Sequence, residues 1–552
     1  MKKVGWYLMG MVPLLAMLAT QFFGSIVFAV GMILNQGPEA AGQAYVDDIM
    51  GVMLVIDLMC LLISGLWYYL LAFRKNRQVE MRRIKSFSWK SAAKILALAV
   101  GLQCAIQVVL NFWNLLDPAQ MEEYAELMEE AGISEFTLLT VIVVAIIGPI
   151  AEELFFRGLT MEYLKRTGAG FWIVNAIQAL MFGIAHLNLV QGTYAFLLGM
   201  ALGYVCMRYE TLLAPVILHI CFNAYSVFMD PLFEILEIPD LFFHLGCAVV
   251  GAVLTWLAFR WIWKETEKVR MLVTGASGFL GSRIVREYAD RYRILAPSHE
   301  KLDLSDEGRV QRYLKKNRPQ IVVHCAAVSD TGWCQQYPAQ SRSINVQGTE
   351  HLARACAAAG SKLIFCSSDQ IYFGSEAPGP HGEEEAVQPA GEYGRQKLEA
   401  EERCLALCPE TVCLRLCWMY DREQLSPKEH GNFLMGFLKS LRQGQAMVYP
   451  VCDFRGITDV RLVAEKLEQT FSLPGGVYNF GSGNNFNMCE TVFRLLQSCG
   501  ISTDRLTANQ EAFKEHPRDI RIRTEKAEQY GIFFPDTLVR LTEVLREVLG
   551  GR

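Results

Sequence analysis

Charged residues are scarce in this sequence: they make up 20% of its 552 residues, while 52% are hydrophobic. This excludes a disordered chain, because disordered segments combine few apolar residues with many charges. An excess of basic residues is also missing. The net charge is −5, so no overall basic field is available for nucleic acid. The 16 cysteines include no Cys-x-x-Cys pair, and we interpret them as reduced, mostly structural thiols.

The few charges are unevenly distributed along the chain. Residues 1–263 hold long apolar runs, whereas residues 270–552 have the composition of an ordinary soluble domain. The mean hydropathy of +0.21 therefore averages two unlike halves, and a single soluble globule is excluded. We predict a transmembrane domain over 1–263, a short charged linker over 264–270 and a soluble domain over 271–552.

Apolar runs that approach the length of a membrane span occur eight times in the first half. A bilayer core requires about 20 apolar residues in a helix. The eight runs are 5–34, 50–72, 93–116, 136–158, 170–187, 193–208, 211–228 and 240–263. The fifth to seventh are short, so we expect them to tilt, re-enter or line a cavity. The first half is predicted to be an α-helical, polytopic bundle in the lipid bilayer.

Lysine and arginine are missing from four connections of this bundle. These connections are 35–49, 117–135, 188–192 and 229–239. The 73–94 connection carries eight such residues: Arg74, Lys75, Arg77, Arg82, Arg83, Lys85, Lys90 and Lys94. Because basic loops stay on the cytoplasmic side, we predict a multi-pass protein of the cell membrane. Its N-terminus and everything after Trp263 are expected in the cytoplasm.

Ionisable residues inside the apolar runs are functional candidates, because charge at membrane depth is costly. The fourth run ends in IIGPIAEELFFRGLTMEYLKR. Its Glu153 and Arg157 are four residues apart and can pair on one helix face. Glu152 then points about 100° away around the helix.

Two further runs carry imidazoles and a carboxamide. His186 lies at the end of the fifth run, and His219 and Asn223 are one turn apart in the seventh. A carboxylate and an imidazole can hold and deprotonate a water, and a second imidazole with a carboxamide can donate to an oxyanion. Each residue alone is explained more simply as an interfacial ion pair or a satisfied bundle residue. Together, on three neighbouring spans, they predict a peptidase.

Helix lengths indicate whether these groups can meet. Counted from the predicted turns at 1.5 Å per residue, Glu152 and His186 differ in depth by about 6 Å. His219 follows its own turn near Thr211 closely. It is therefore expected nearer the membrane surface, unless the seventh helix starts deeper than drawn.

Three motifs, EExxxR, FxxxH and HxxxN, follow in order on separate predicted helices over about 130–230. Their residues are Glu152, Glu153, Arg157, Phe182, His186, His219 and Asn223. The pattern resembles the CPBP family, the CaaX-prenyl-protease and bacteriocin-processing intramembrane proteases, also called Abi proteins. The resemblance implies an intramembrane endopeptidase that cleaves a peptide or a membrane protein.

The resemblance also implies a role for each motif residue. Glu152 and His186 activate the water, the HxxxN motif stabilises the oxyanion, and the Glu153–Arg157 pair supports the site. A zinc ion bound through Glu152, His186 and His219 is the alternative, since Glu and His are zinc ligands. We slightly favour the metal-free mechanism.

The second half opens with a dinucleotide-binding pattern. In VRMLVTGASGFLGS a short apolar strand runs into Gly275-x-x-Gly278-x-x-Gly281, and an amphipathic helix follows. Glycines at this spacing let the backbone approach a pyrophosphate at the helix N-terminus. Strands and helices then alternate, which predicts an α/β, Rossmann-type, doubly wound parallel sheet.

A serine, a tyrosine and a lysine follow in the order that a reductase needs. Ser368 lies at the C-terminal end of the strand in LIFCSSDQIYFG, where such folds bind ligands. Tyr393 and Lys397 share one helix face in GEYGRQKLEAE. We expect Lys397 to lower the pKa of Tyr393, which then acts as acid or base, while Ser368 holds the substrate oxygen. A solvated Tyr–Lys pair is the simpler interpretation of the last motif alone.

Over its whole length the second half resembles the extended short-chain dehydrogenase/reductases, most closely the dTDP-4-dehydrorhamnose reductase branch. The stretches that carry the resemblance are LDLSDEGRV, HCAAVSD, INVQGTEHLARA, CSSDQIYFG and HPRDIRIRTEKAEQYGI. The branch usually has Ser-Thr-Asp where this chain has Ser367-Ser368-Asp369, which keeps the hydroxyl. The resemblance implies reduction of a nucleotide-linked sugar, such as a dTDP-4-keto sugar, with NADP or NAD.

The resemblance also implies the residues that bind the cofactor. They are Gly275, Ser277, Gly278, Phe279, Leu280, Gly281, Asp303, Leu304, Ala326, Ala327, Asn345, Tyr393 and Lys397. The second strand, in YRILAPS, is followed directly by Ala296, Pro297 and Ser298, so no acidic residue stands at its end to hold a ribose diol. A strict preference for NAD is therefore not expected, and NADP is compatible.

The sequence thus predicts an intramembrane endopeptidase joined to a cytosolic NAD(P)-dependent sugar-nucleotide reductase. Three alternatives stay open. The soluble half could be a cofactor-binding sensor without turnover, although intact Ser368, Tyr393 and Lys397 favour catalysis. The membrane half could be a non-proteolytic anchor or an immunity protein, which cleavage dependent on Glu152 would exclude. Met271 could also start a free reductase if two adjacent reading frames are joined.

Overall fold

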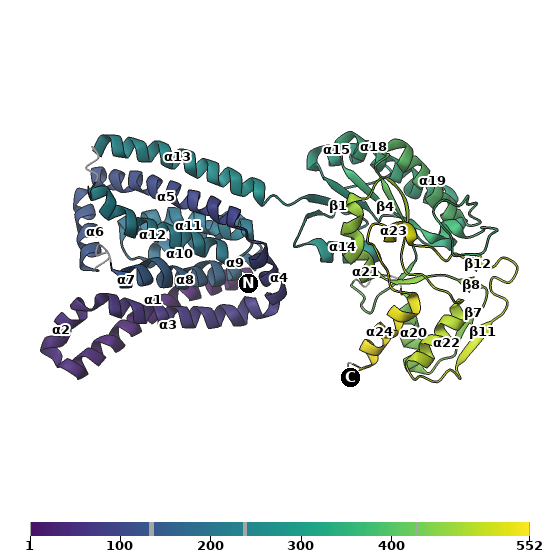
Figure 1. The fold of residues 1–552 in the computed structure, drawn as a ribbon, viewed down its shortest axis with the longest axis horizontal. Helices are drawn as coiled ribbons and strands as arrows, with labels where there is room; N and C mark the ends of the chain where they lie inside the picture. Colours follow the sequence, from purple (N-terminus) through teal and green to yellow (C-terminus); the bar gives the residue numbers. More distant parts are fainter. Residues whose placement is uncertain (1, 132–136, 236–239, 426–428, 430, 551–552) are drawn as a thin grey trace. The chain divides into compact units, whose positions relative to one another are not determined.

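The computed structural model describes residues 2–131, 137–235, 240–425, 429 and 431–550 (Figure 1). The chain forms two compact units, Met1–Glu267 and Lys268–Arg552. Their boundary falls inside the stretch expected as a linker, 264–270, whose first two residues belong to the last helix of the first unit. The predicted connection at 229–239 lies outside the residues whose side chains are described.

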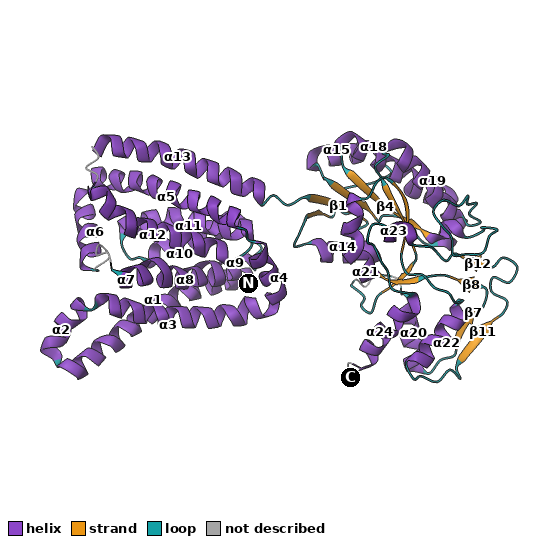
Figure 2. Ribbon diagram, viewed as in Figure 1, coloured by secondary structure: helices purple, strands orange, loops and turns teal. Residues whose placement is uncertain are grey.

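The first unit is helical throughout its described part (Figure 2). Its α-helices are α1 (Lys2–Gln36), α2 (Pro38–Asp47), α3 (Ile49–Tyr68), α4 (Arg74–Ser86), α5 (Trp89–Leu116), α6 (Pro118–Glu130), α7 (Leu138–Thr140), α8 (Gly148–Glu153), α9 (Met161–Lys165), α10 (Phe171–Ala185), α11 (Leu189–Tyr209), α12 (Leu213–Ile235) and α13 (Asp240–Glu265). Three π-helical segments join α3 to α4, α7 to α8 and α8 to α9: η1 (Tyr69–Phe73), η2 (Val141–Ile147) and η3 (Leu154–Thr160).

Local sequence explains where several of these helices begin. The Ser88 hydroxyl accepts a hydrogen bond from the Ser91 N–H at the start of α5. The Asp117 carboxylate does the same for the Gln120 N–H at the start of α6, whose first residue is a proline. Side-chain acceptors and an initial proline satisfy the free N–H groups of a first turn. The apolar core of the unit takes side chains from most of its long helices, with large contributions from α5, η3 and α11.

Six described helices are long and apolar enough to cross a membrane, judged by length and composition. They are Lys3–Asn35, Ile49–Phe73, Trp89–Leu116, Leu138–Lys165, Leu189–Tyr209 and Leu245–Glu265. Two shorter apolar helices, Phe171–Ala185 and Leu213–Phe228, match the fifth and seventh predicted runs. The sixth run, expected to be short, has 21 residues because the helix starts earlier. The helical class is confirmed, and the count of eight spans is approximate.

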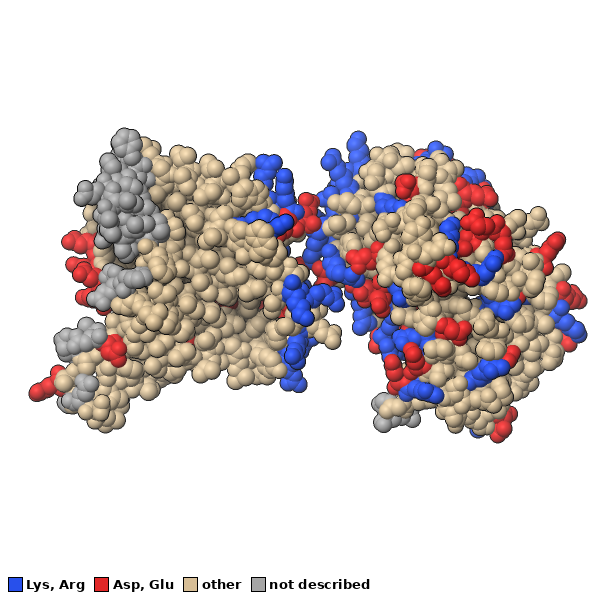
Figure 3. Space-filling model, viewed as in Figure 1, with Lys and Arg blue, Asp and Glu red and all other residues tan. Residues whose placement is uncertain are grey.

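The surface of the first unit carries its charged residues mainly at two opposite ends (Figure 3). Figure 3 shows a broad band of mostly uncharged residues between an end with acidic side chains and an end with basic ones. Large apolar side chains such as Leu8, Phe22 and Leu62 are exposed on the outside of α1 and α3. A soluble surface rarely exposes so much apolar area, whereas a lipid-facing surface does. These features indicate a membrane protein.

The second unit contains a six-stranded sheet in which every neighbouring pair is parallel. The strand order is β10-β5-β4-β3-β1-β2. Its strands are β1 (Arg270–Thr274), β2 (Arg293–Leu295), β3 (Ile321–His324), β4 (Lys362–Ser368), β5 (Val412–Leu416) and β10 (Gly476–Phe480). The order reverses between β1 and β3, and doubly wound folds bind ligands outside the strand ends at such a point.

Helices cover both faces of the sheet (Figure 2). Met271 and Val273 of β1 pack on the face covered by α14 (Phe279–Tyr288) and α21 (Val460–Lys466). Leu272, between them, points to the opposite face, where α15 (Glu307–Asn317), α18 (Thr349–Ala359) and α19 (Glu392–Leu407) lie. This alternation is that of a strand buried on both sides. The predicted α/β doubly wound class is confirmed.

The remaining elements form the walls around the sheet's carboxyl edge and a second, smaller core. They are α16 (Thr331–Gln336), α17 (Pro338–Arg342), η4 (Ser343–Gly348), η5 (Asp369–Tyr372), β6 (Trp418–Tyr420), α20 (Phe433–Gln443), β7 (Met447–Pro450), β8 (Asp453–Phe454), β9 (Ile457–Asp459), η6 (Leu467–Ser472), α22 (Met488–Ser498), β11 (Leu506–Asn509), β12 (Arg518–Asp519), α23 (Glu525–Glu528) and α24 (Thr537–Gly550). Apolar side chains of α20, α22 and α24 build the smaller core.

Candidate active sites

The helical unit contains a cavity of about 590 Å³. Four of the predicted site residues line it: Glu152 from α8, His186 just after α10, and His219 and Asn223 from α12. Side chains from three separate apolar runs therefore meet at one polar space. A cavity of this size accommodates a water molecule together with part of a peptide chain.

A fully buried ion pair lies behind the cavity wall. Arg157 Nη1 donates to Glu153 Oε1 over 2.9 Å, and neither side chain is exposed. His219 Nδ1 lies 2.8 Å from the same carboxylate oxygen. Because a carboxylate only accepts, His219 carries its proton on Nδ1 and turns Nε2 toward Glu152 Oε2, 3.6 Å away. Glu153, expected only to support Arg157, thus also orients His219.

His219 lies at the depth of Glu153 and not nearer the surface. Glu153 is twelve residues before the end of α9, about 18 Å of helix, whereas His219 is six residues after the start of α12, about 9 Å. The two helices therefore begin at different depths. The shallow position expected for His219 is wrong, for the reason that the seventh helix starts deeper.

His186 and Asn223 are each held by a backbone carbonyl. His186 Nδ1 is 2.9 Å from the Phe182 carbonyl oxygen, so this nitrogen carries the proton and Nε2 keeps a lone pair for a base. Asn223 Nδ2 donates to the Val144 carbonyl over 2.8 Å, which leaves one amide hydrogen for another acceptor. The Phe182 ring lies edge-on to both imidazoles, with centroids 5.0 Å from His186 and 5.7 Å from His219.

Two π-helical segments, η2 and η3, enclose the short α8 that carries both glutamates. Extra residues in a helix turn displace side chains and free carbonyls, and such turns are frequent at functional sites. The Val144 carbonyl that holds Asn223 belongs to η2. Sequence patterns show no signal for these segments.

One ionisable residue of the cavity was missed by the sequence analysis. Asp57 of α3 lines the cavity together with Glu152. The signal that could have found it is the same one used for the other residues, namely a charge inside an apolar run. Gln103 of α5 was also missed, and it donates to the Phe222 carbonyl and to Ser226, fixing α5 against α12.

The structure gives no support for zinc in this unit. Among the described residues, no group of three or more His, Cys, Asp or Glu side chains is placed to hold a metal ion. A zinc site needs three protein ligands about 2 Å from one point. The zinc alternative through Glu152, His186 and His219 is therefore not supported.

The glycine loop of the second unit has the shape that a dinucleotide requires. Gly275 has a φ of 66°, and a Cβ there would lie 2.7 Å from the Ala326 nitrogen. A Cβ on Gly281 would lie 2.2 Å from the Gly275 oxygen. Gly278 is exposed at the start of α14, and its Cβ would meet only that oxygen, at 3.2 Å. The outer two glycines are thus required by packing, and the middle one leaves space for a ligand.

Other predicted cofactor residues hold the loops at the carboxyl ends of the strands in place. Asn345 accepts from the Val328 N–H over 2.8 Å and donates to its carbonyl over 3.0 Å. It therefore positions the loop after β3 that contains Ala326 and Ala327. Asp303 accepts two hydrogen bonds from Ser305, which lower the pKa of Asp303. Of the remaining predicted residues, Ser277 is exposed, Phe279 is half-buried, and Leu280 and Leu304 are buried in the cores.

Ser368, Tyr393 and Lys397 come together where β4 meets α19. Burial raises the pKa of Tyr393, the Asp369 carboxylate adds to this, and a hydrogen bond with Ser368 opposes it. Lys397 Nζ donates to the Cys366 carbonyl over 2.8 Å and lies 5.8 Å from the Tyr393 ring centre. The expected lowering of the Tyr393 pKa by Lys397 is wrong for this structure, because the ammonium group is directed to a carbonyl.

Two buried charged groups lie beside these residues: Asp369, which the sequence placed at the end of the strand, and Arg455, which sequence reasoning missed. Asp369 has one carboxylate oxygen without a hydrogen-bond partner in the described chain, and burial raises its pKa to about 6. Arg455 is buried next to Asp453 and above the Trp418 ring, and its Nη2 also has no hydrogen-bond partner among described residues. Unsatisfied buried polar groups indicate a place for a polar ligand or water.

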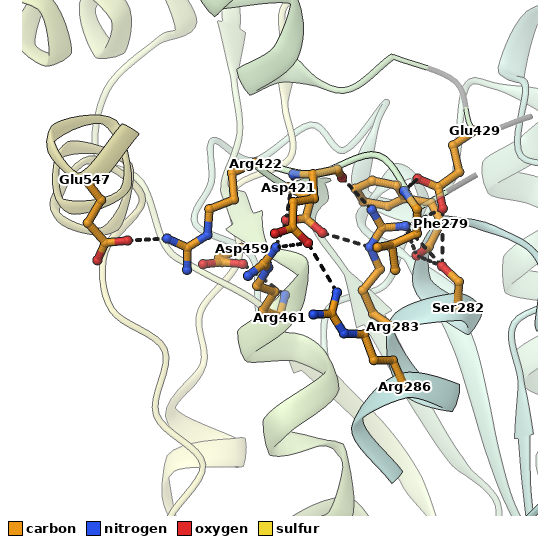
Figure 4. A network of polar contacts seen from close by, with 12 residues as sticks. Phe279, Ser282, Arg283, Arg286, Asp421, Arg422, Glu429, Asp459, Arg461 and Glu547 are labelled. Carbon is orange, nitrogen blue, oxygen red and sulfur yellow. Dashed lines mark hydrogen bonds and ion pairs between the residues drawn. The ribbon is translucent and has the colours of Figure 1, made fainter. Parts of the chain in front are cut away.

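A polar network fastens the helix after the glycine loop to the segment that follows β6 (Figure 4). Arg283 of α14 donates to Asp421 over 2.9 Å and to Glu429 over 2.5 Å. Arg461 of α21 donates to the other oxygen of Asp421 over 2.9 Å. Buried, mutually satisfied charges of this kind hold loops in one arrangement. The network thus holds α14, α21 and the segment after β6 in one arrangement.

Comparison with known proteins gives two family matches. The model described as RmlD substrate binding domain matches residues 269–548, and the one described as Type II CAAX prenyl endopeptidase Rce1-like matches residues 134–225. The dTDP-4-dehydrorhamnose reductase of Mycobacterium tuberculosis (strain ATCC 25618 / H37Rv) is 30% identical over 249 residues, 43% of this chain and 78% of that protein. Methionine adenosyltransferase 2 subunit beta of Danio rerio is 25% identical over 287 residues, 49% of this chain and 87% of that protein.

The solved structures include a dTDP-4-dehydrorhamnose reductase from Bacillus anthracis in complex with NADP. It is 20% identical, with a TM-score of 0.46, and the match covers 51% of this chain and 98% of that one. A UDP-glucose 4-epimerase from Thermotoga maritima is 21% identical, with a TM-score of 0.43, over 51% of this chain and 99% of that one.

Proposed function

The chain belongs to the RmlD substrate binding domain family through residues 269–548, and from this premise we propose that it joins an NADP-dependent sugar-nucleotide reductase to an intramembrane endopeptidase. For the reductase, the observation that carries the proposal is the assembly of Ser368, Tyr393 and Lys397 at the carboxyl end of β4, in the same sheet as the β1 strand that leads into the glycine loop. For the endopeptidase it is the cavity shared by Glu152, His186, His219 and Asn223.

The residues of the second unit fit a bound dinucleotide. Gly275 and Gly281 shape the loop, Gly278 lets the pyrophosphate approach, and α14 directs its free N–H groups there. The reduced cofactor, NADPH, would supply the hydride when bound. The residues directly at the end of β2, Ala296, Pro297 and Ser298, are not acidic, and this favours the phosphorylated cofactor over NAD. We propose that the ammonium group of Lys397, which donates to the Cys366 carbonyl here, holds the nicotinamide ribose when the cofactor binds.

Tyr393 acts as the proton donor. Because burial keeps its pKa high, the phenol retains its proton at neutral pH and gives it to the keto oxygen as the hydride adds to the carbon. Ser368 donates a hydrogen bond to the same oxygen and holds the carbonyl in line. By similarity to the curated reductases, the substrate is a dTDP-linked 4-keto sugar.

In the endopeptidase, Glu152 and His186 hold the attacking water. Its oxygen adds to the peptide carbonyl carbon, and its proton moves to Glu152 or to His186 Nε2. Asn223 and a protonated His219, whose Nδ1–H is fixed by Glu153, donate to the developing oxyanion. The stored proton then passes to the leaving amine, and the two peptide ends separate. We place the N-terminus and the reductase unit on the cytoplasmic side.

The reductase is tested with Tyr393→Phe in the full-length chain reconstituted in lipid nanodiscs. NADPH affinity should change less than about 2-fold, while single-turnover hydride transfer to a panel of dTDP-4-keto sugars should fall about 10²–10⁴-fold. Tyr530→Phe, an exposed tyrosine of the same unit, is the matched control. Tight NADPH binding without oxidation on any sugar would instead indicate a sensor.

The endopeptidase is tested with Glu152→Gln, which keeps the shape and removes the base. Cleavage of a membrane-inserted peptide should fall at least ~100-fold, with unchanged folding by circular dichroism. Glu39→Gln on the exposed face of α2 should cleave like the wild type. Full activity of Glu152→Gln would contradict the assignment and favour an anchor or immunity role.

A further inference from the structure

The intramembrane cavity contains a carboxylate that the proposed chemistry does not use. Asp57 lies within the apolar run of α3 and lines the cavity together with Glu152. A Cβ on Gly148 would lie 3.2 Å from Asp57 Oδ2. The Asp57 carboxylate therefore rests against the first residue of α8, about one helical turn before Glu152.

Asp57 is not paired by the protein. Within the described residues no hydrogen bond or ion pair engages its carboxylate, in contrast to Glu153, which binds both Arg157 and His219. None of the described residues that line the cavity is a lysine or an arginine. The cavity thus presents two carboxylates, Asp57 and Glu152, and its only basic side chains are imidazoles.

Two carboxylates that face one half-buried cavity repel each other, and a positive charge between them relieves that repulsion. A substrate side chain that ends in a cation supplies that charge. The rest of the wall suits such a side chain, because Met17, Met53 and Met128 are flexible apolar groups for a methylene stem. Gln103 and Gln107 offer further polar contacts.

We propose that Asp57 selects the substrate of the endopeptidase by binding the guanidinium or ammonium group of a basic residue in the cleaved peptide. This inference rests on the proposed endopeptidase. A carboxylate and a guanidinium form two parallel charge-assisted hydrogen bonds, which a neutral side chain of equal size cannot replace. The cation binds one helical turn from Glu152, so the scissile bond is placed beside the water-activating pair.

The α6 helix, which lines one side of the cavity, is negatively charged like the cavity itself. Tyr124 and Met128 of α6 line the cavity, and Tyr124 hydrogen-bonds Tyr194 of α11 over 3.1 Å. The other face of α6 exposes five acidic residues: Glu122, Glu123, Glu126, Glu129 and Glu130. Acidic groups near a binding cavity raise the local concentration of cationic ligands.

The experiment measures binding separately from cleavage. The full-length Glu152→Gln chain in lipid nanodiscs is titrated with two fluorescent apolar peptides that differ only in one arginine or its neutral isostere citrulline. The arginine peptide should bind at least ~10-fold more tightly. Asp57→Asn in the same background should abolish that difference and leave citrulline-peptide binding within about 2-fold. Asp48→Asn, which removes an exposed carboxylate at the start of α3, is the matched control and should keep the preference.

Equal binding of the two peptides by the Glu152→Gln chain would overturn the inference without any Asp57 variant. A preference that survives in Asp57→Asn, or in Asp57→Ser if the asparagine variant does not fold, would also overturn it. Loss of binding of both peptides in a folded Asp57 variant would overturn the inference too, because Asp57 would then maintain the shape of the cavity and would not recognise the cation. If the chain with Glu152 intact cleaves both peptides equally, the endopeptidase stands and the selectivity does not. If it cleaves neither, the endopeptidase itself fails.

Discussion

Replacing Glu153 with glutamine removes the charge that holds Arg157 and His219 in place. Arg157 Nη1 and His219 Nδ1 both donate to the Oε1 atom of Glu153, over 2.9 and 2.8 Å. Each is a charge-assisted hydrogen bond worth about 1.5–3 kcal/mol. Because Arg157 would be left as a buried, uncompensated cation, Glu153→Gln should lower the free energy of unfolding of the helical unit by about 3–5 kcal/mol.

A double-mutant cycle separates the pair from the rest of the site. Arg157→Met alone should also destabilise the unit, because Glu153 then loses its guanidinium partner. The double variant, Glu153→Gln with Arg157→Met, replaces both charges by neutral groups of similar size. It should recover at least ~2 kcal/mol of the sum of the single losses, measured by denaturant titration in mixed micelles with circular dichroism.

Cleavage by the same variants distinguishes stability from catalysis. The double variant should regain stability but not activity, because His219 still lacks the carboxylate that fixes its Nδ1–H. Additive losses in the cycle would refute the claim that Glu153 and Arg157 compensate each other inside the bundle. Recovery of full activity in the double variant would refute the orienting role of Glu153.

Three further predictions concern cofactor binding, pH dependence and topology. Gly278→Val should abolish NADPH binding in equilibrium titrations without loss of stability, whereas Gly281→Ala should lower the melting temperature because its Cβ meets backbone at 2.2 Å; the reverse would contradict the assigned roles. Burial raises the pKa of Asp369 from 3.8 to about 6, so its ionisation destabilises the fold as pH rises through this window, and the penalty is absent below about pH 4. The free energy of unfolding of Asp369→Asn should therefore be about 3 kcal/mol higher than that of the wild type at pH 7.5 and equal to it near pH 4, as followed by thermal denaturation. An equal difference at both pH values would disprove the argument. A reporter fused after Arg552 should be active in the cytoplasm, and a cysteine at Ala125 should react with an external thiol reagent; an external C-terminus together with a cytoplasmic N-terminus would contradict the count of eight spans.

Much of this protein was predictable from local patterns in the sequence. Apolar runs separate the membrane unit from the soluble one, because bilayer thickness sets the length of a span. The glycine spacing after β1 and the alternation of strands and helices predict the doubly wound sheet, and the two family resemblances are confirmed by the matches over 134–225 and 269–548. These features are encoded by residues close together in the chain.

Contacts between distant residues were decided only by the tertiary structure. The depth of His219 depends on where α12 begins relative to α9, and the partners of Glu153 come from two helices. Asp57 joins the cavity because α3 packs against α8, and the high pKa of Tyr393 follows from its burial beside Asp369. Depth, burial and pairing are properties of packed elements, and a sequence pattern describes one element at a time.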